Sequence, residues 1–186
     1  MFNMKKQFLG ILSIFFLFSG CISDSENSLT RFEREVERIE EYLRVNNISS
    51  VKEFSDPLLG IYMFWQDLSE SGIRPIDGDS VFVDYTGKLL DNSIFDTSIE
   101  QVARENNLFN SQRNYRPLGV LLGAGRVIAG FEFGISKLEQ GDKAFIIFPS
   151  LFGYGDDPRA GELRNQPLIF EMDLIEVKKN DIDDGL

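Results

Sequence analysis

The sequence predicts an α+β fold in which an antiparallel β-sheet packs against one short central α-helix, with a further helix on its N-terminal side. After residue 57, several segments alternate apolar and polar residues with the period of two that marks a β-strand. A single short stretch among them has the pattern of a helix. Upstream of these strands, a charged stretch repeats its apolar residues at helical spacing. The 186 residues suffice for one ordinary domain with a short appendage.

The first part of the chain, residues 1–20, has the pattern of a secretory signal peptide. Two lysines precede an apolar run over residues 8–18, which is too short to span a membrane as a helix. Cys21 is the one cysteine of the chain, so it cannot form an internal disulfide. Residues 18–21 resemble the lipobox of bacterial lipoproteins, in which the cysteine is acylated. The alternative is that Cys21 is a late residue of an ordinary signal peptide.

Lipidation at Cys21 would make this a cell-envelope protein anchored in a membrane. Each methylene group of an acyl chain contributes about 0.8 kcal/mol when buried, and more than one chain makes the anchoring stable. Ile22 stands where enteric lipoproteins of the inner membrane carry Asp, so the pattern favours the outer membrane, with the domain in the periplasm or on the surface. Residues 21–29 are acidic and serine-rich and are predicted to form a flexible tether.

The next stretch, residues 30–56, is predicted to be a helical segment. Thr30 and Glu33 match a capping box, and residues 46–47 are two asparagines that provide a stop. One interpretation is an amphipathic helix that packs on the domain or spaces it from the membrane. The other is a dimerisation seam for a homodimer, which at about two heptads would be marginal by itself. Its apolar residues recur at spacings of four, three and four: Phe32, Val36, Ile39 and Leu43.

The main domain is predicted to span residues 57–178, with an acidic tail over residues 179–186. Between two of its strands, the polar stretch of residues 99–116 is either a functional flap or a disordered insert. The expected elements of the domain are strands over residues 58–65, 80–90, 143–148 and 168–177, and a helix over residues 127–138.

Composition excludes several classes of function. The formal net charge of −11 argues against a nucleic-acid partner, because phosphate binding needs clustered cations. Histidine is absent, which removes Ser-His and Cys-His catalysis and the most common metal ligand, so neither metal nor cofactor is expected. Gly123 and Gly125 begin a G-x-G pattern, but Ile128 takes the place of its third glycine. These glycines and Gly130 are therefore assigned to tight turns around the helix start.

Four sequence blocks follow one another in order along the predicted domain. They cover residues 78–89 with 94–98, then 117–123 with 127–134 and 141–144, then 148–155, and finally 168–174. In order and spacing they resemble the FKBP-type peptidyl-prolyl cis/trans isomerases. Four ordered blocks are a far more specific signal than any single motif.

The resemblance implies a strongly twisted antiparallel sheet wrapped around one short helix, and catalysis at the X-Pro bonds of proline-containing polypeptides. In the family, the Tyr85 counterpart pairs with the Asp96 counterpart, and the Tyr154 counterpart donates a hydrogen bond to a substrate carbonyl. The backbone N–H of the Ile128 counterpart binds another carbonyl. The implied substrate rim is Leu118 and Leu163. The implied catalytic pocket consists of Tyr85, Phe95, Asp96, Val127, Ile128, Phe131, Tyr154 and Phe170.

Four features depart from the family pattern. Phe131 stands where many members have Trp, and Leu118 takes a position that is often aromatic. Residues 161–167 form a shorter loop than the proline-containing tip that normally caps the substrate. The polar stretch of residues 99–116 also lengthens one rim of the pocket. Since these departures lie at the floor and the rim, the resemblance does not define the substrate preference of this chain.

The implied chemistry suits a chain without histidine. Resonance holds a peptide bond planar with a rotation barrier of about 18–20 kcal/mol, and its rotation makes and breaks no covalent bond. An apolar pocket that excludes water can favour the twisted, less polar amide without any base. The sequence also leaves open an envelope chaperone or assembly factor that binds clients in the same pocket with little turnover, or a scaffold that recruits a partner through the N-terminal helix.

Overall fold

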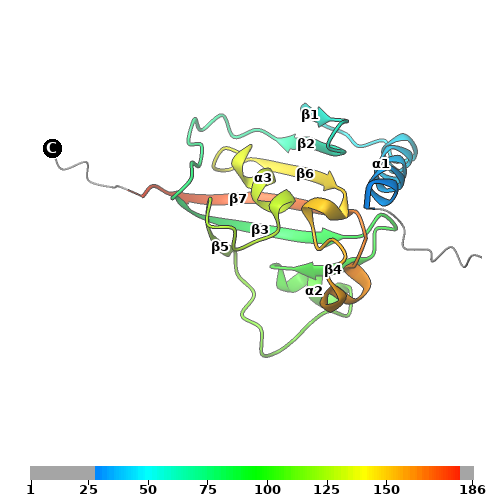
Figure 1. The fold of residues 1–186 in the computed structure, drawn as a ribbon. Coiled ribbons are helices and arrows are strands. Elements are labelled where there is room, and N and C mark those ends of the chain that lie inside the picture. The colour runs from blue at the N-terminus through cyan, green and yellow to red at the C-terminus, as the bar shows by residue number, and fades with distance from the viewer. Residues whose placement is uncertain (1–27, 181–186) are drawn as a thin grey trace, which may run out of the picture.

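The computed structural model describes residues 28–180 (Figure 1). The predicted signal peptide, Cys21 and most of the predicted tether lie outside the described residues, as does the tail from residue 181. Within residues 28–180, no helix combines the length and the apolar character that a membrane crossing requires.

The described residues form α-helices, 3-10 helices and seven β-strands. In chain order the elements are α1 (Ser28–Val45), β1 (Lys52–Asp56), β2 (Ile61–Asp67), β3 (Ser80–Lys88), β4 (Ile94–Thr97), α2 (Glu100–Glu105), β5 (Leu118–Leu121), α3 (Ala129–Ser136), β6 (Lys143–Phe148), the 3-10 helices η1 (Ser150–Phe152) and η2 (Pro158–Leu163), and β7 (Leu168–Lys178).

The strands form one antiparallel sheet with α3 on one face (Figure 1). The strand order is β1-β2-β6-β7-β3-β4, and β5 pairs with β3 beside this path. The longest strand, β7, lies between β6 and β3 and pairs with both, with Phe170 opposite Ile146 and Met172 opposite Tyr85. The predicted class, antiparallel sheet and central helix are thereby confirmed.

Two glycines let α3 lie unusually close to the sheet. A Cβ atom at Gly130 would lie 2.5 Å from the ring of Phe148, and one at Gly134 would lie 2.8 Å from the sulfur of Met172. Real Cβ atoms do not approach neighbours this closely, so any larger residue would push the helix away. The assignment of Gly130 to a tight turn was therefore wrong, because it is a packing residue inside α3.

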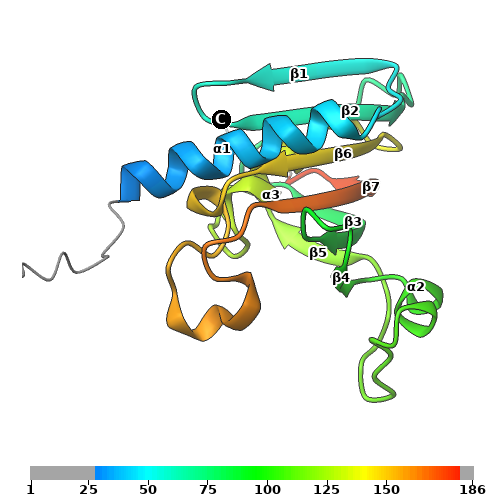
Figure 2. The same cartoon turned by 90° about the vertical axis from the view of Figure 1, so that its right-hand side faces the viewer.

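Part of the opposite face of the sheet is covered by α1 (Figure 2). Ile39 and Tyr42 of α1 are buried against Phe145 and Ile147 of β6, while Ile146 between them faces the α3 side. Because this strand is covered on both of its faces, every residue of β6 after Lys143 is buried. Of the two interpretations of the N-terminal helix, packing on the domain is the one that the structure shows.

Several predicted boundaries were wrong. The helix begins at Ser28, so Thr30 lies inside it and does not cap it, and it ends at Val45, beside the predicted asparagine stop. Residues 52–56 are not helical but form β1, so the sheet begins before residue 57. The sequence pattern missed β1 because it is a short edge strand with a single apolar residue, Phe54.

Candidate active site

A cavity of about 370 Å³ opens between β3, β4, the N-terminal end of α3 and the loop after β6. All eight residues of the predicted catalytic pocket line it, together with Leu118 of the predicted rim. Gly125 and Arg126 complete its lining. Leu163 does not line the cavity; it lies in η2, half-buried against the main core. The structure therefore brings together the residues that stand far apart in the sequence, with Leu163 as the exception.

The floor of the cavity is a cluster of aromatic rings in edge-to-face contact. The ring centroids of Phe131 and Phe170 are 5.0 Å apart at 79°, those of Tyr85 and Phe131 5.4 Å apart at 85°, and those of Phe95 and Phe170 5.7 Å apart at 88°. Such geometry stabilises a ring pair by about 0.5–1.5 kcal/mol beyond the burial of apolar area. The result is a packed apolar floor with Phe170 at its centre, in which Phe131 stands where the family resemblance places Trp in many members.

A glycine that sequence reasoning did not select makes room for this floor. Gly87 of β3 lies opposite Phe170 of β7, and a Cβ at this position would be 2.6 Å from the ring of Phe95. The ring of Phe95 can therefore approach the strand this closely only because residue 87 has no side chain. Its sequence signal was the Thr86-Gly87 pair inside an otherwise regular strand, since an isolated glycine in a strand often marks a close approach.

At one edge of the cavity, Asp96 is the centre of a polar network. The hydroxyl of Tyr85 donates a hydrogen bond to one carboxylate oxygen at 2.5 Å. The other oxygen accepts from the backbone N–H of Thr97 at 2.9 Å and forms an ion pair with Arg113. The guanidinium of Arg113 also donates to the hydroxyl of Tyr85 at 3.1 Å. The predicted Tyr85–Asp96 pair is present, and Arg113 is an addition.

Burial of the phenol is the main reason why the pKa of Tyr85 rises to about 12, and the hydrogen bond to Asp96 and its negative charge add to this effect. The positive charge of Arg113 acts in the opposite direction. Tyr85 therefore stays protonated at physiological pH and remains the donor toward Asp96. This network holds the tyrosine ring against Phe131, and protein donors engage both oxygens of Asp96.

Sequence reasoning missed Arg113 because it lies in the polar stretch of residues 99–116. That stretch is structured: it contains α2, and the rings of Phe109 and Tyr115 stack with centroids 5.8 Å apart. Arg104 lies over the ring of Phe109 at 3.4 Å. The signal that could have identified Arg113 was the need of a carboxylate in an aromatic surround for a cationic partner.

Two hydrogen-bond donors of residues that line the cavity have no protein partner among residues 28–180. Tyr154 lines the cavity and is 37% exposed, and no acceptor within the described part of the chain binds its hydroxyl. Burial, and then the charge of Asp96, raise the pKa of this hydroxyl, so it stays protonated. Ile128 is the N-cap residue of α3, where the helix itself offers no acceptor to a backbone N–H. Its N–H donates no hydrogen bond to another residue of the described part of the chain.

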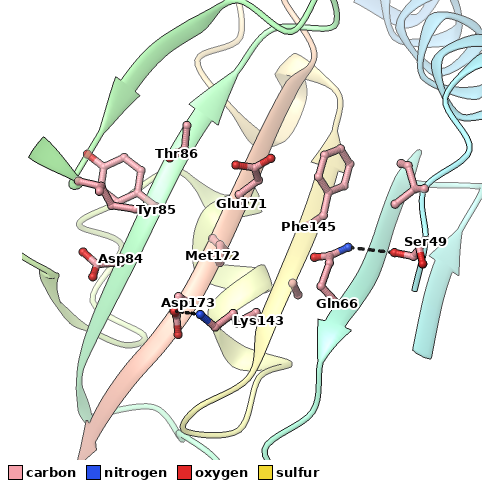
Figure 3. Close-up of a pocket in the computed structure, with 13 residues that line it drawn as sticks. Ser49, Gln66, Asp84, Tyr85, Thr86, Lys143, Phe145, Glu171, Met172 and Asp173 are labelled. Atoms are coloured by element: carbon pink, nitrogen blue, oxygen red, sulfur yellow. Dashed lines mark hydrogen bonds and ion pairs between the residues drawn. The ribbon is translucent and has the colours of Figure 1, made fainter. Parts of the chain in front are cut away.

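A second cavity, of about 480 Å³, lies on the α1 side of the sheet (Figure 3). Its lining includes charged side chains, such as Lys143, whose ammonium lies 2.8 Å from the carboxylate of Asp173. Figure 3 shows the labelled lining side chains spread across β3, β7, β6 and β2 rather than converging on one point. Within residues 28–180, no group of three or more His, Cys, Asp or Glu side chains could hold a metal ion. The aromatic cavity is therefore the better candidate for an active site.

The model of the family described as FKBP-type peptidyl-prolyl cis-trans isomerase matches residues 72–175, which is more than half of the chain. The chain belongs to this family. The matched residues run from the loop before β3 through most of β7, so the FKBP domain contains every residue that lines the aromatic cavity.

Individual relatives agree with this assignment. The short-type peptidyl-prolyl cis-trans isomerase of Methanocaldococcus jannaschii is 39% identical over 95 residues, which cover 51% of this chain and 55% of the relative. The chain thus spans about half the length of that protein. The FK506-binding protein of Neisseria meningitidis serogroup C is 33% identical over 114 residues, 60% of this chain and 93% of the relative.

Solved structures share the fold of this FKBP chain. A peptidyl-prolyl cis-trans isomerase from Pseudomonas syringae pv. tomato superposes with a TM-score of 0.58 at 26% identity, covering 82% of this chain and 97% of that one. FkpA from Escherichia coli gives a TM-score of 0.59 at 24% identity over 81% of this chain and 62% of that one.

Proposed function

We propose that this chain is a peptidyl-prolyl cis/trans isomerase that acts on the X-Pro bonds of exported or envelope proteins. The observation that carries the proposal is the aromatic cavity, in which an apolar floor lies beside two hydrogen-bond donors that have no partner within residues 28–180. These donors are the hydroxyl of Tyr154 and the N–H of Ile128. A proline ring fits an apolar floor, and the two carbonyl groups next to it fit the donors.

The cavity supplies what prolyl rotation requires. As the amide twists it loses resonance and polarity, so apolar walls stabilise the twisted form more than the planar form. A preference for the transition state over the ground state is what accelerates a reaction. If this preference lowers the barrier by about 4 kcal/mol, the rate rises roughly a thousandfold.

The polar groups act by positioning the substrate. Tyr154 and Ile128 would bind carbonyl oxygens of the peptide and hold the rest of the chain still while the prolyl bond turns. Asp96 would not exchange protons with the substrate, because Arg113 and Tyr85 occupy its oxygens. Its part is to fix the ring of Tyr85 as a wall of the cavity.

The N-terminal sequence supports a place for this activity in the cell envelope. A signal-like segment over residues 1–20 and the lipobox-like Cys21 support a lipid-anchored protein of the cell envelope, on the outer membrane and facing the periplasm or the surface. There the substrates would be exported polypeptides with X-Pro bonds. Metabolic labelling with a fatty acid tests the anchor: the label is expected in the wild-type protein and absent from Cys21→Ala.

The activity itself is tested by isomerisation of a short proline peptide, followed by protease-coupled cleavage, with the purified full-length chain. Tyr154→Phe removes one hydrogen bond to the substrate and is expected to lower kcat/KM by up to about tenfold, because such a bond contributes about 1 kcal/mol. Tyr62→Phe is the matched control, since this hydroxyl binds Glu40 on the α1 side of the sheet. It is expected to leave kcat/KM unchanged.

The same measurement decides between the enzyme and a binding module that uses the cavity to hold clients. A wild-type chain that gives no acceleration above the uncatalysed rate, yet suppresses aggregation of an unfolded client, would replace the isomerase with a chaperone. Equal kcat/KM values for Tyr154→Phe, Asp96→Ala and the wild-type chain would show that the cavity is not the active site.

A further inference from the structure

A buried carboxylate on α1 has no part in the mechanism so far. Glu35 is 3% exposed, and both of its oxygens bind the same residue, Ser150 of η1. One oxygen accepts from the backbone N–H of Ser150 at 2.5 Å and the other from its hydroxyl at 2.8 Å. Burying a carboxylate is costly, and packing of a helix on a sheet would be served by an apolar residue. We therefore infer that Glu35 is buried for its two hydrogen bonds with Ser150 rather than for packing.

Ser150 in turn organises the backbone around Tyr154. Its carbonyl accepts hydrogen bonds from the N–H of Gly153 at 2.9 Å and from the N–H of Gly155 at 2.8 Å. These two residues flank Tyr154, so both peptide neighbours of the tyrosine are tied to one carbonyl group. The carbonyl of Gly155 accepts from the N–H of Asn165 at 2.7 Å, which connects the turn to the loop before β7.

The junction between α1 and this turn is tightly packed. Gly60, in the turn between β1 and β2, has a φ of +65°, and a Cβ there would lie 2.7 Å from a methyl of Val36 and 3.3 Å from the ring of Pro149. Helix α1, the β1–β2 turn and the residue before Ser150 thus meet at one point. Figure 2 shows α1 running beside the loop after β6 at this end of the sheet. A displacement of α1 would therefore also displace Ser150.

We propose that Glu35 is a positioning residue for the isomerase reaction, which fixes the turn of residues 150–155 through Ser150 and so holds the hydroxyl of Tyr154 at the cavity. This inference rests on the proposed function. It assigns to α1, which lies outside the residues that match the family model, a part in the geometry of the active site.

A double-mutant cycle tests the proposal, with kcat/KM of the full-length chain for a proline peptide as the readout. Glu35→Gln keeps the shape of the side chain but brings an NH₂ group against the donors of Ser150. In the wild-type background it is expected to lower kcat/KM by about tenfold, because a small misplacement of a binding group is costly in catalysis. In the Tyr154→Phe background the same change is expected to alter kcat/KM less than about twofold, because the hydroxyl it positions is gone.

The controls separate positioning from general stability. Glu37→Gln changes an exposed acid of the same helix and is expected to leave kcat/KM unchanged. Thermal unfolding is expected to shift equally when Glu35→Gln is made in either background. If Glu35→Gln does not fold, Ser150→Ala removes one of the two hydrogen bonds and is expected to give a smaller loss, again absent in the Tyr154→Phe background. An equal fold-change in both backgrounds, or no change, overturns the proposal.

An inactive wild-type chain would overturn the proposed isomerase function and not by itself the role of Glu35. In that case, hydrogen exchange of the amides of Gly153 and Gly155 decides. Faster exchange in Glu35→Gln than in Glu37→Gln is expected if Glu35 fixes the turn. Equal exchange rates would show that it does not.

Discussion

Tyr85 joins the apolar and polar halves of the cavity in a single side chain. Its ring packs edge-to-face on Phe131, and its hydroxyl binds Asp96 and accepts from Arg113. The phenol must therefore remain neutral, because an ionised Tyr85 beside the carboxylate would be repelled and would lose its role as donor. Burial and Asp96 together ensure this by raising the pKa of the phenol to about 12.

The raised pKa predicts a specific loss of stability at alkaline pH. The folded protein holds the Tyr85 proton more tightly than the unfolded chain, whose tyrosine has its ordinary pKa of 10.0. The stabilising contribution is therefore complete below pH 10 and is lost as the pH rises toward 12. Two pH units correspond to roughly 2–3 kcal/mol. Urea unfolding between pH 9 and 12 is expected to show a steeper decline for the wild-type chain than for Tyr85→Phe.

Other tyrosines provide the control for this measurement. The pKa of Tyr62 is also raised, by burial and then by the charge of Glu40, but its hydroxyl lies on the α1 side of the sheet. Tyr85→Phe is expected to remove part of the loss of stability between pH 9 and 12, and Tyr62→Phe is expected to retain that part. Identical slopes for Tyr85→Phe and the wild-type chain would show that this phenol is not held neutral by its surroundings.

At the scale of elements, the distance between α3 and the sheet determines the shape of the cavity. Phe148 packs against the helix at Gly130 and stacks on Phe170 with ring centroids 5.9 Å apart at 11°. Phe170 in turn contacts Phe131, Phe95 and Tyr85. A displacement of α3 is therefore passed through Phe148 into the aromatic floor.

Gly130→Ala tests this packing. Alanine favours a helix over glycine by about 1 kcal/mol, so an open position would be stabilised by the change. Here the new methyl overlaps the ring of Phe148, and overpacking in a core costs about 1–3 kcal/mol. The expected net result is a lower free energy of unfolding in urea and a lower kcat/KM. Ser136→Ala, at an exposed position of α3, is the control, and a more stable Gly130→Ala protein would contradict the packing.

The elements that periodicity predicted well are the ones buried by long-range contacts on a regular face. The strand of residues 143–148 has the predicted bounds, and the last strand differs by one residue at Lys178. By contrast, β1 has little apolar content, and α2 is a six-residue helix in a polar stretch. Short, exposed elements owe their structure to neighbours that the local sequence does not specify.

In the candidate site, too, some residues could be predicted from the sequence and others could not. The aromatic residues of the pocket could be named because the four ordered blocks resemble the FKBP family and imply a role for each matching position. Arg113 and Glu35 could not be assigned their contacts, since each binds a residue far away in the chain, at 17 and 115 positions from its partner. Contacts of this kind arise from the fold as a whole.

At the scale of the whole molecule, the net charge is −11, and few of the acidic side chains in the described part of the chain are buried. Asp79 and Asp142 are each 2% exposed and act as connectors between distant segments. Asp79 accepts from the N–H of Ile76 at 2.8 Å and of Asn180 at 3.0 Å. It therefore ties the end of β7 to the loop before β3, and its charge is compensated by Lys179.

Asp142 predicts how the molecule responds to acid. Burial alone would raise the pKa of this carboxyl, but hydrogen bonds from the N–H of Glu139 and from the N–H and hydroxyl of Ser69 outweigh it, so the pKa lies below its ordinary value. A lowered pKa means that the folded state releases this proton more readily than the unfolded chain. The stability that Asp142 contributes is thus present above the ordinary carboxyl pKa of about 4 and is lost as the pH falls further.

Urea unfolding of the wild-type chain and of Asp142→Asn from pH 7 to pH 3 measures this contribution. At pH 7 the variant is expected to be less stable by about 1–3 kcal/mol, because the amide leaves buried donors without an acceptor. As the pH falls the wild-type chain loses the advantage, so the two curves converge. Asp67→Asn, at an exposed position of β2, should follow the wild-type curve throughout. If the free energy of unfolding falls with pH in parallel for Asp142→Asn and the wild-type chain, the prediction is wrong. Protonation of Asp142 would then not weaken the junction between the β2–β3 loop and the α3–β6 turn.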